Sequence, residues 1–130
     1  MPLVRIDLRS GHSPVVRQAV GDAVHRAMVE TIGVPEEDRF QVITEHSAEG
    51  LVYDPGYLGI RRSDGIVFVQ ITLNAGRTVE QKRALYARIA ALVSQRAEIR
   101  PADVLVSLVE VTRENWSFGE GLAPYAPPAG

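Results

Sequence analysis

Four short stretches of this chain have the pattern of β-strands, and two longer stretches carry apolar residues at helical spacing. Strands are predicted over residues 3–8, 40–45, 66–73 and 104–111. One helix is predicted from Pro14 to about Ile32, and another is predicted to begin after Thr78. Their apolar faces are formed by Val16, Val20, Ala23, Val24, Ala27 and Met28, and by Leu85, Ile89 and Leu92.

Capping residues set the limits of both helices. Ser13 precedes a proline at the first helical position, and Gly33 suits the helix end. Thr78 and Gln81 have the spacing of a capping box. Residues 46–65, with four glycines and no helical period, are interpreted as a connecting loop with room for a short hairpin.

The two halves of the chain repeat at an offset of 65 residues. Val4, Ile6, Leu8 and Gly11 fall on Val69, Ile71, Leu73 and Gly76, and Ser13 falls on Thr78. Asp38 falls on Asp103, and Glu45 falls on Glu110. Each half is therefore predicted to be a strand–helix–strand unit with parallel strands and a right-handed crossover.

Two such units predict an α/β fold, a tandem β-α-β repeat whose four-stranded sheet carries two helices on one face. We expect one domain over 1–130, with units at 2–45 and 66–111. The loop 46–65 joins the units, and a tail follows over 112–130. Because strand 66–73 has few charges on either side, we expect both its faces to be buried, and hence association with other copies.

Composition narrows the classes of function. The chain is 45% hydrophobic and 23% charged, its net charge is −2, and it contains no cysteine. No basic stripe favours nucleic acid, no apolar run could cross a membrane, and thiol catalysis is excluded. The three histidines lack metal-ligand spacing, and no signal peptide is evident, so we expect a cytoplasmic protein without a metal.

Pro2, Asp38 and Arg77 are the candidates for chemistry. Removal of Met1 would expose Pro2 as a secondary amine, whose pKa burial would lower toward neutrality, although many proteins begin with Met-Pro. On its position alone, Asp38 is better interpreted as a solvated loop acid or a strand-start cap than as a functional residue. Arg77, at the second helix entrance, is either an exposed arginine or a carboxylate ligand.

Aromatic residues gather in the tail, where Trp116 and Phe118 lie two positions apart. They either form the wall of a pocket or anchor the tail to the core, and the two roles are compatible. The tail is otherwise rich in glycine and proline and is predicted to form no long element.

The sequence resembles the tautomerase superfamily, and within it the malonate semialdehyde decarboxylase branch. The likeness lies in Met1-Pro2-Leu3, in Gly33-Val34-Pro35 with Asp38-Arg39-Phe40, and in Val109-Glu110 followed by Trp116-Ser117-Phe118-Gly119-Glu120-Gly121. The segment Gly76-Arg77-Thr78-Val79-Glu80-Gln81-Lys82 is similar to the short 4-oxalocrotonate tautomerases. The likeness spans almost the whole chain.

The resemblance implies a homotrimer of double β-α-β units. It implies that Pro2 is catalytic, that Asp38 assists it, that Arg77 binds the substrate carboxylate, and that Trp116 and Phe118 form the pocket wall. We expect no cofactor, because an amine and an arginine supply both proton transfer and charge stabilisation. One departure stands out, since the decarboxylase branch carries an arginine where this chain has Ala75.

These features predict keto-enol proton transfer on a small oxo acid. The alternatives are decarboxylation of a 3-oxo acid, hydration of a related unsaturated acid, and a non-catalytic trimeric module that binds a ligand. A retained Met1 would favour the last of these, because it would block the amine.

Overall fold

The computed structural model describes residues 2–128, which form a β-α-β unit followed by a second one. The first contains β1 (Leu3–Arg9), α1 (Pro14–Ile32) and β2 (Gln41–His46). The second contains β3 (Val67–Asn74), α2 (Val79–Ala97) and β4 (Val104–Val111). The predicted strands agree with these bounds to within one residue at each end, and the first helix agrees at both ends.

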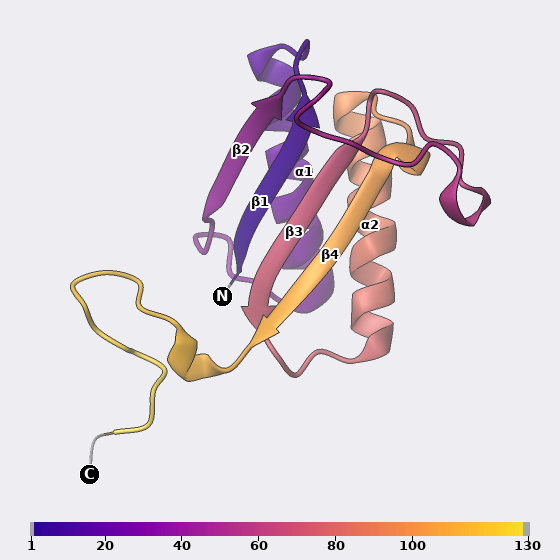
Figure 1. Cartoon of the computed structure of the whole chain (residues 1–130). Helices are drawn as coiled ribbons and strands as arrows, with labels where there is room; N and C mark the ends of the chain where they lie inside the picture. The colour runs from indigo at the N-terminus through magenta and orange to yellow at the C-terminus, as the bar shows by residue number, and fades with distance from the viewer. Residues whose placement is uncertain (1, 129–130) are drawn as a thin grey trace.

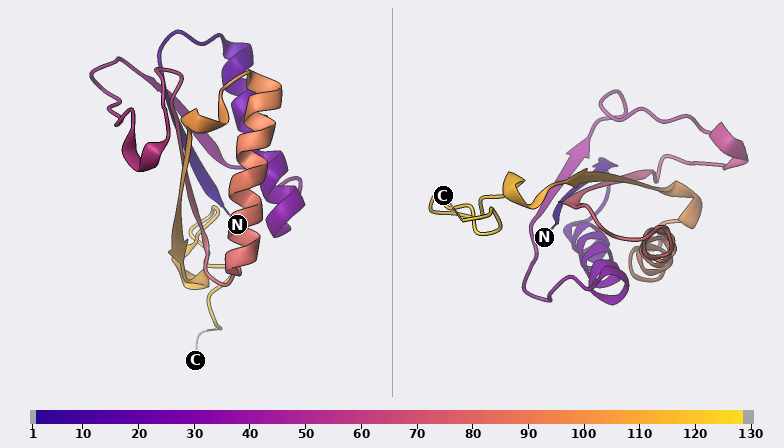
Figure 2. Two further views of the ribbon diagram at one scale, coloured as in Figure 1. Left: turned by 90° about the vertical axis from the view of Figure 1, so that its right-hand side faces the viewer. Right: turned by 90° about the horizontal axis from the view of Figure 1, so that it is seen from below.

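The strands form one mixed sheet in the order β2-β1-β3-β4. β1 pairs in parallel with β2, β3 pairs in parallel with β4, and the antiparallel pairing of β1 with β3 joins the two units. Both helices cover the same face of the sheet (Figures 1 and 2). The tandem β-α-β fold predicted from the sequence is confirmed.

The core lies between that sheet face and the two helices. Every second residue of β1 and β3 points into it, because side chains alternate across a strand. The core side chains of these strands and of the two helices are Val4, Ile6, Leu8, Val67, Val69, Ile71 and Leu73, with Val20, Ala23, Val24, Ala27, Met28, Ile32, Leu85, Ile89, Leu92, Val93 and Ala97. These include nearly all of the apolar positions predicted for the two helices.

The repeat extends to the turns that start each helix. Gly11 and Gly76 both have a positive φ, of 117° and 126°, which favours glycine at each position. Ser13 and Thr78 then cap α1 and α2 with nearly identical backbone angles. The Thr78 cap is a complete capping box, since the Gln81 side chain also accepts from the Thr78 amide.

Ion pairs repeat as well. Arg17 of α1 pairs with Glu45 of β2, and Lys82 of α2 pairs with Glu110 of β4, 65 residues later in each case. The Lys82 ammonium lies 2.8 Å from the Glu110 carboxylate and lowers the pKa of that carboxyl. Each pair joins the first helical turns to the end of the last strand in its unit.

The second face of the sheet is not covered by any helix of residues 2–128 (Figure 2). In the single chain only one face of β3 is buried; on the other, Phe68 and Thr72 are half-buried and Gln70 is exposed. Leu105 and Val109 of β4, 41% and 39% exposed, lie beside them on that face. The helices cover only one side of this strand, so burial of its second face, as predicted, would require association with other copies.

The connecting loop forms a 3-10 turn at Tyr57–Gly59 rather than a hairpin. It crosses one end of the uncovered sheet face, where Arg9 donates to the Leu51 carbonyl and pairs with Asp64. The tail leaves the opposite end of the sheet and projects away from it, as Figure 1 shows. Apart from a 3-10 turn at Arg113–Asn115, its described residues form no regular element.

Candidate active site at the amino end of β1

Antiparallel pairing brings the start of the chain to the end of β3. Leu3 lies opposite Thr72, so Pro2 is near the residues that lead into α2. The loop that precedes β2 and the start of the tail lie at this same end of the sheet (Figure 1). Segments distant in sequence therefore meet at the amino end of β1.

Pro2 lines a mostly apolar cavity of about 200 Å³. The side chains around it are those of Leu3, Phe40, Trp116, Ser117 and Phe118. Pro2 itself is buried, and Trp116 and Phe118 are half-buried. The structure thus joins Pro2 with both aromatic residues that the sequence singled out.

Phe118 lies at the centre of an aromatic cluster. Its ring stacks on Trp116, with centroids 5.4 Å apart and planes 10° apart. It also contacts Phe40 at 6.2 Å and meets Tyr125 edge-on at 5.6 Å. Because such contacts are favourable, the cluster anchors the tail and also walls the cavity, so both predicted roles are compatible with the arrangement.

Asn74 connects this cavity to a second, more polar one. Its side-chain oxygen accepts a hydrogen bond of 2.8 Å from the Trp116 indole, and its main-chain carbonyl accepts one of 3.1 Å from the Arg77 guanidinium. The second cavity, of about 340 Å³, is lined by Asn74, Ala75, Gly76, Arg77, Gln81 and Arg113. Arg77 therefore lies beside the Pro2 cavity, not in it.

Arg113 is a cation that sequence reasoning did not single out. It comes from the 3-10 turn after β4 and lines the same cavity as Ala75 and Arg77. No spacing in the sequence relates residues 77 and 113. Only the parallel pairing of β3 with β4, whose ends both lie here, places the two arginines together.

Asp38 is a buried carboxylate, since only 5% of the residue is exposed. It follows the α1 end, in the loop that leads to β2, where its amide donates to the Pro35 carbonyl. Burial raises the pKa of the Asp38 carboxyl, while the amino terminus, and His25 when it is protonated, act in the opposite direction. The interpretation as a solvated loop acid is therefore wrong.

The equivalent acid of the second unit, Asp103, is also buried, at 1% exposure. Its carboxylate accepts hydrogen bonds from the Ser63 amide at 2.7 Å and the Ser63 hydroxyl at 2.5 Å. Ser63 belongs to the chain that runs into β3. In the second unit, therefore, this carboxylate holds the segment just before the first strand of its repeat.

Comparison with known families decides the identity of the fold. A family model described as "Tautomerase enzyme" matches residues 38–119, and a second model with the same description matches residues 2–61. The chain belongs to the tautomerase superfamily. The matched ranges together include all five residues that the sequence proposed for this site.

Relatives of this tautomerase superfamily member are similar over almost its whole length. A protein of Bacillus subtilis (strain 168) described as "Probable tautomerase YusQ" is 43% identical over 95% of this chain and 97% of its own. The crystal structure of FG41 malonate semialdehyde decarboxylase inhibited by 3-bromopropiolate is 37% identical, with a TM-score of 0.90 over 95% and 93% of the two chains. A fused 4-OT described as a symmetric trimer is 28% identical, with a TM-score of 0.76 over 92% and 94%.

In residues 2–128, no helix combines the length and apolar character that a membrane crossing requires. The same residues contain no group of three or more histidine, aspartate or glutamate side chains placed to hold a metal ion.

The two buried acids should respond differently to Asp→Asn substitution. Because the pKa of Asp38 is higher in the folded chain than the ordinary value of 3.8, the folded chain loses stability as pH rises above that value. Asp38→Asn removes this loss, so its free energy of unfolding should increase relative to wild type from acid to neutral pH. Urea denaturation across this pH range measures the difference.

Asp103→Asn is the matched control. Its two hydrogen bonds to Ser63 lose their charge assistance, so at neutral pH it should destabilise the chain by about 1 kcal/mol. Equal losses of stability in the two variants would contradict the distinction between these acids.

Proposed function

We propose that this protein is a tautomerase that moves a proton on a small enolisable oxo acid, with the amine of Pro2 as the proton carrier. The observation that carries the proposal is the placement of Pro2 in an apolar cavity with Trp116 and Phe118. An amine in apolar surroundings is disfavoured as a cation, so its pKa falls toward neutrality. Such an amine both accepts and returns a proton.

The amine requires that the mature chain begin at Pro2. Met1 and its removal lie outside the described residues, and this step is part of the proposal. Proline is a small second residue, which permits removal of the initiator methionine. The secondary amine then stands at the cavity wall without any cofactor.

Asp38 is proposed to hold this amine. Asp103, its equivalent in the second unit, binds the main chain just before β3 through Ser63. The corresponding place in the first unit is the amino end of β1, where the Pro2 amine belongs. A buried carboxylate there orients the amine and stabilises its protonated form.

Arg77 is proposed to bind the substrate carboxylate, with Arg113 as a second cation in the same cavity. A guanidinium binds a carboxylate through two parallel hydrogen bonds, which fixes the orientation of the acid. The amides that open α2 add favourable partial charge. The enolisable carbon of the acid then extends past Asn74 toward Pro2.

In the proposed reaction the neutral amine of Pro2 takes the proton from the enol oxygen. Loss of this proton leaves an enolate. Its oxygen then re-forms the carbonyl, and the electron pair of the carbon–carbon double bond takes the proton back from the protonated amine, so that a new carbon–hydrogen bond forms. The amine is neutral again at the end, so the step is an isomerisation that consumes nothing. Arg77 and Arg113 stabilise the negative charge of the intermediate enolate.

Decarboxylation of a 3-oxo acid is the second candidate, and the Asp38 burial favours it. A carboxylate close to the amine stabilises the ammonium form, which polarises a substrate carbonyl and accepts charge as carbon dioxide leaves. The similarity to a malonate semialdehyde decarboxylase points the same way. Ala75 favours tautomerisation, because the second arginine of that branch is absent at this position.

A homotrimer is proposed as the working assembly. The sheet face opposite the helices exposes Val42, Leu105 and Val109, and one related structure is described as a symmetric trimer. Association would remove these apolar side chains from water. It would also bury the second face of β3.

The first prediction for this function concerns Pro2 and the choice of substrate. Protein made without a tag should lose Met1 by intact mass, and should ketonise phenylenolpyruvate faster than it consumes malonate semialdehyde. Pro2→Ala, with a primary amine at a different position, should lower both activities by about tenfold or more. A chain that keeps Met1 with full activity would exclude the amine mechanism, and faster loss of malonate semialdehyde would favour the decarboxylase.

The second prediction concerns Arg77. Arg77→Ala removes a charge-assisted contact worth about 1.5–3 kcal/mol, so kcat/KM for phenylenolpyruvate should fall about tenfold to a hundredfold. Arg77→Lys should recover only part of this loss, because an ammonium lacks the planar fork. Steady-state kinetics with denaturation curves separate loss of binding from loss of folding.

Arg61→Ala is the control, because Arg61 is exposed and its loop lies at the opposite end of the sheet from the β3–α2 connection that lines this cavity (Figure 1). Arg113→Ala tests the second cation and should lower kcat/KM less than Arg77→Ala. Equal losses from Arg61→Ala and Arg77→Ala would show that overall positive charge, and not this contact, attracts the acid.

The third prediction concerns assembly. Light scattering at micromolar concentration should give about three times the chain mass of 14.2 kDa. Leu105→Glu places a charge on the uncovered sheet face and should reduce the measured mass, whereas Leu122→Glu in the exposed tail should not. A monomeric wild-type protein would refute the proposed trimer.

A further inference from the structure

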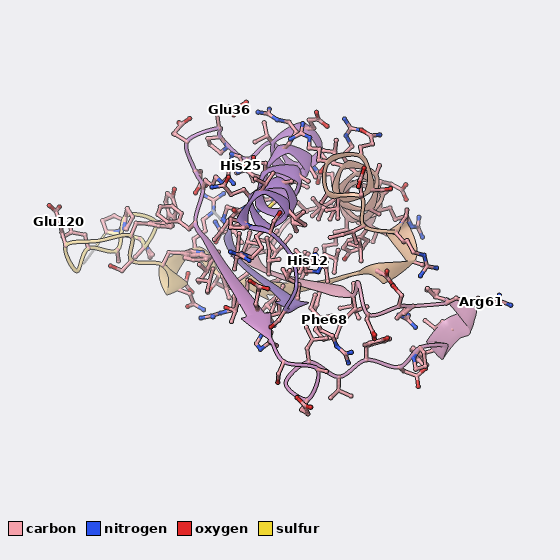
Figure 3. The ribbon with its side chains drawn as sticks, turned by 90° about the horizontal axis from the view of Figure 1, so that it is seen from above. His12, His25, Glu36, Arg61, Phe68 and Glu120 are labelled. Carbon is pink, nitrogen blue, oxygen red and sulfur yellow. The ribbon has the colours of Figure 1, made fainter. Side chains whose placement is uncertain are left out.

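Two neighbouring residues of α1 bind Glu36 in the loop before β2. The His25 Nε2 atom lies 2.8 Å from the Glu36 carbonyl oxygen. A carbonyl only accepts hydrogen bonds, so Nε2 carries the hydrogen and donates it. Arg26 donates to both carboxylate oxygens of the same residue, at 2.7 and 3.0 Å. Figure 3 shows His25 and Glu36 together on the α1 side of the molecule.

These two contacts differ in burial. His25 is only 5% exposed, and its Nδ1 atom is buried as well. The side chains of Arg26 and Glu36 are 34% and 61% exposed, and exposed ion pairs contribute little to stability. The His25 hydrogen bond is therefore the contact that restrains the Glu36 main chain, since breaking it would leave buried polar groups unsatisfied.

The restrained main chain is part of the turn that carries Asp38. Gly33 caps the end of α1 in the left-handed conformation, with φ of 70°. The Gly33 amide donates to the Met28 carbonyl. The Asp38 amide then donates to the Pro35 carbonyl at 3.1 Å, closing a turn around Glu36 and Glu37. Fixing the Glu36 carbonyl thus fixes the centre of the turn, and with it the position of the Asp38 carboxylate.

We propose that His25 is a positioning residue for Asp38, acting through its hydrogen bond to the Glu36 main chain. The bond keeps the turn against α1, so that the Asp38 carboxylate stays buried at the amino end of β1. The consequence for activity rests on the proposed function, whereas the consequence for the burial and titration of Asp38 does not.

The burial of Asp38 and the charge of His25 shift the pKa of the Asp38 carboxyl in opposite directions. A protonated His25 lowers the pKa of the Asp38 carboxyl, and burial raises it more strongly. The charges that act on Asp38 are those of the amino terminus, His25 and Glu37, whereas Arg26 and Glu36 pair with each other. Losing the bond therefore lowers the Asp38 pKa by admitting water, while losing only the charge raises it.

The experiment compares His25→Leu, which removes the donor, with His25→Gln, whose side-chain amide retains an N–H for the Glu36 carbonyl. The pKa of Asp38 is read from the carbon-13 shift of its carboxyl during a pH titration. The pKa should fall toward the ordinary value in His25→Leu, and should stay the same or rise in His25→Gln. If His25→Leu does not fold, His25→Asn, whose shorter amide does not reach Glu36, replaces it.

Arg26→Ala is the matched control, because it breaks the exposed contact to the same Glu36 and should leave the Asp38 titration unchanged. With phenylenolpyruvate, His25→Leu should lower kcat about tenfold with little change in KM, and His25→Gln should recover most of the loss. An Asp38 pKa that rises or is unchanged in His25→Leu would overturn the positioning role, as would equal effects of His25→Leu and Arg26→Ala.

Asp38→Asn separates this inference from the proposed function. If Asp38→Asn leaves kcat unchanged while His25→Leu still lowers the Asp38 pKa, the proposed role of Asp38 in catalysis fails and the positioning role stands. If Asp38→Asn lowers kcat and His25→Leu changes neither kcat nor the Asp38 pKa, the reverse holds.

Discussion

The antiparallel pairing of β1 with β3 is the constraint on which the rest of this molecule depends. It joins two β-α-β units that each have parallel strands, and its register sets Leu3 opposite Thr72 and Leu8 opposite Val67. Because the pairing is antiparallel, the beginning of β1 meets the end of β3, together with the loop before β2 and the start of the tail. A shift of one residue would turn Val4, Ile6 and Leu8 away from the helices, so the core holds this register strongly. The position of the site is thus a consequence of how the core packs.

Each unit buries an aspartate at the equivalent position, and the two aspartates have different surroundings. Asp103 is satisfied by Ser63 and holds the connecting loop against the second unit, which is a structural task. Asp38 is the equivalent residue of the first unit, and burial raises the pKa of its carboxyl. The surroundings of the two aspartates differ because the connecting loop, which runs into β3, supplies Ser63 to Asp103. The asymmetry of the proposed active site follows from connectivity, although the repeated elements themselves are closely matched at Gly11 and Gly76 and at their caps.

Much of the candidate site could be predicted from sequence, but its grouping could not. Pro2, Trp116 and Phe118 were identified as separate features and share one cavity, while Arg77 lines the neighbouring one. Arg113 and His25 were not predicted as site residues, because no spacing in the sequence relates either of them to its neighbours in space. Arg113 reaches Arg77 through the pairing of β3 with β4, and His25 reaches Glu36 because the chain reverses after Gly33. Such contacts depend on where a turn directs the chain, which local pattern does not encode.

The sequence by itself determined the elements, their limits and the repeat. Alternation and helical spacing report which side of each element avoids water, and Ser13, Gly33 and Thr78 terminate helices by local hydrogen bonds, so neither depends on the rest of the fold. Only the tertiary structure decided which groups lose their water. It made Asp38 a buried acid where the sequence also allowed a solvated one, and it showed that within one chain the helices bury only one face of β3. Burial is a property of everything that packs around a residue, and in this chain those neighbours come from segments far apart in the sequence.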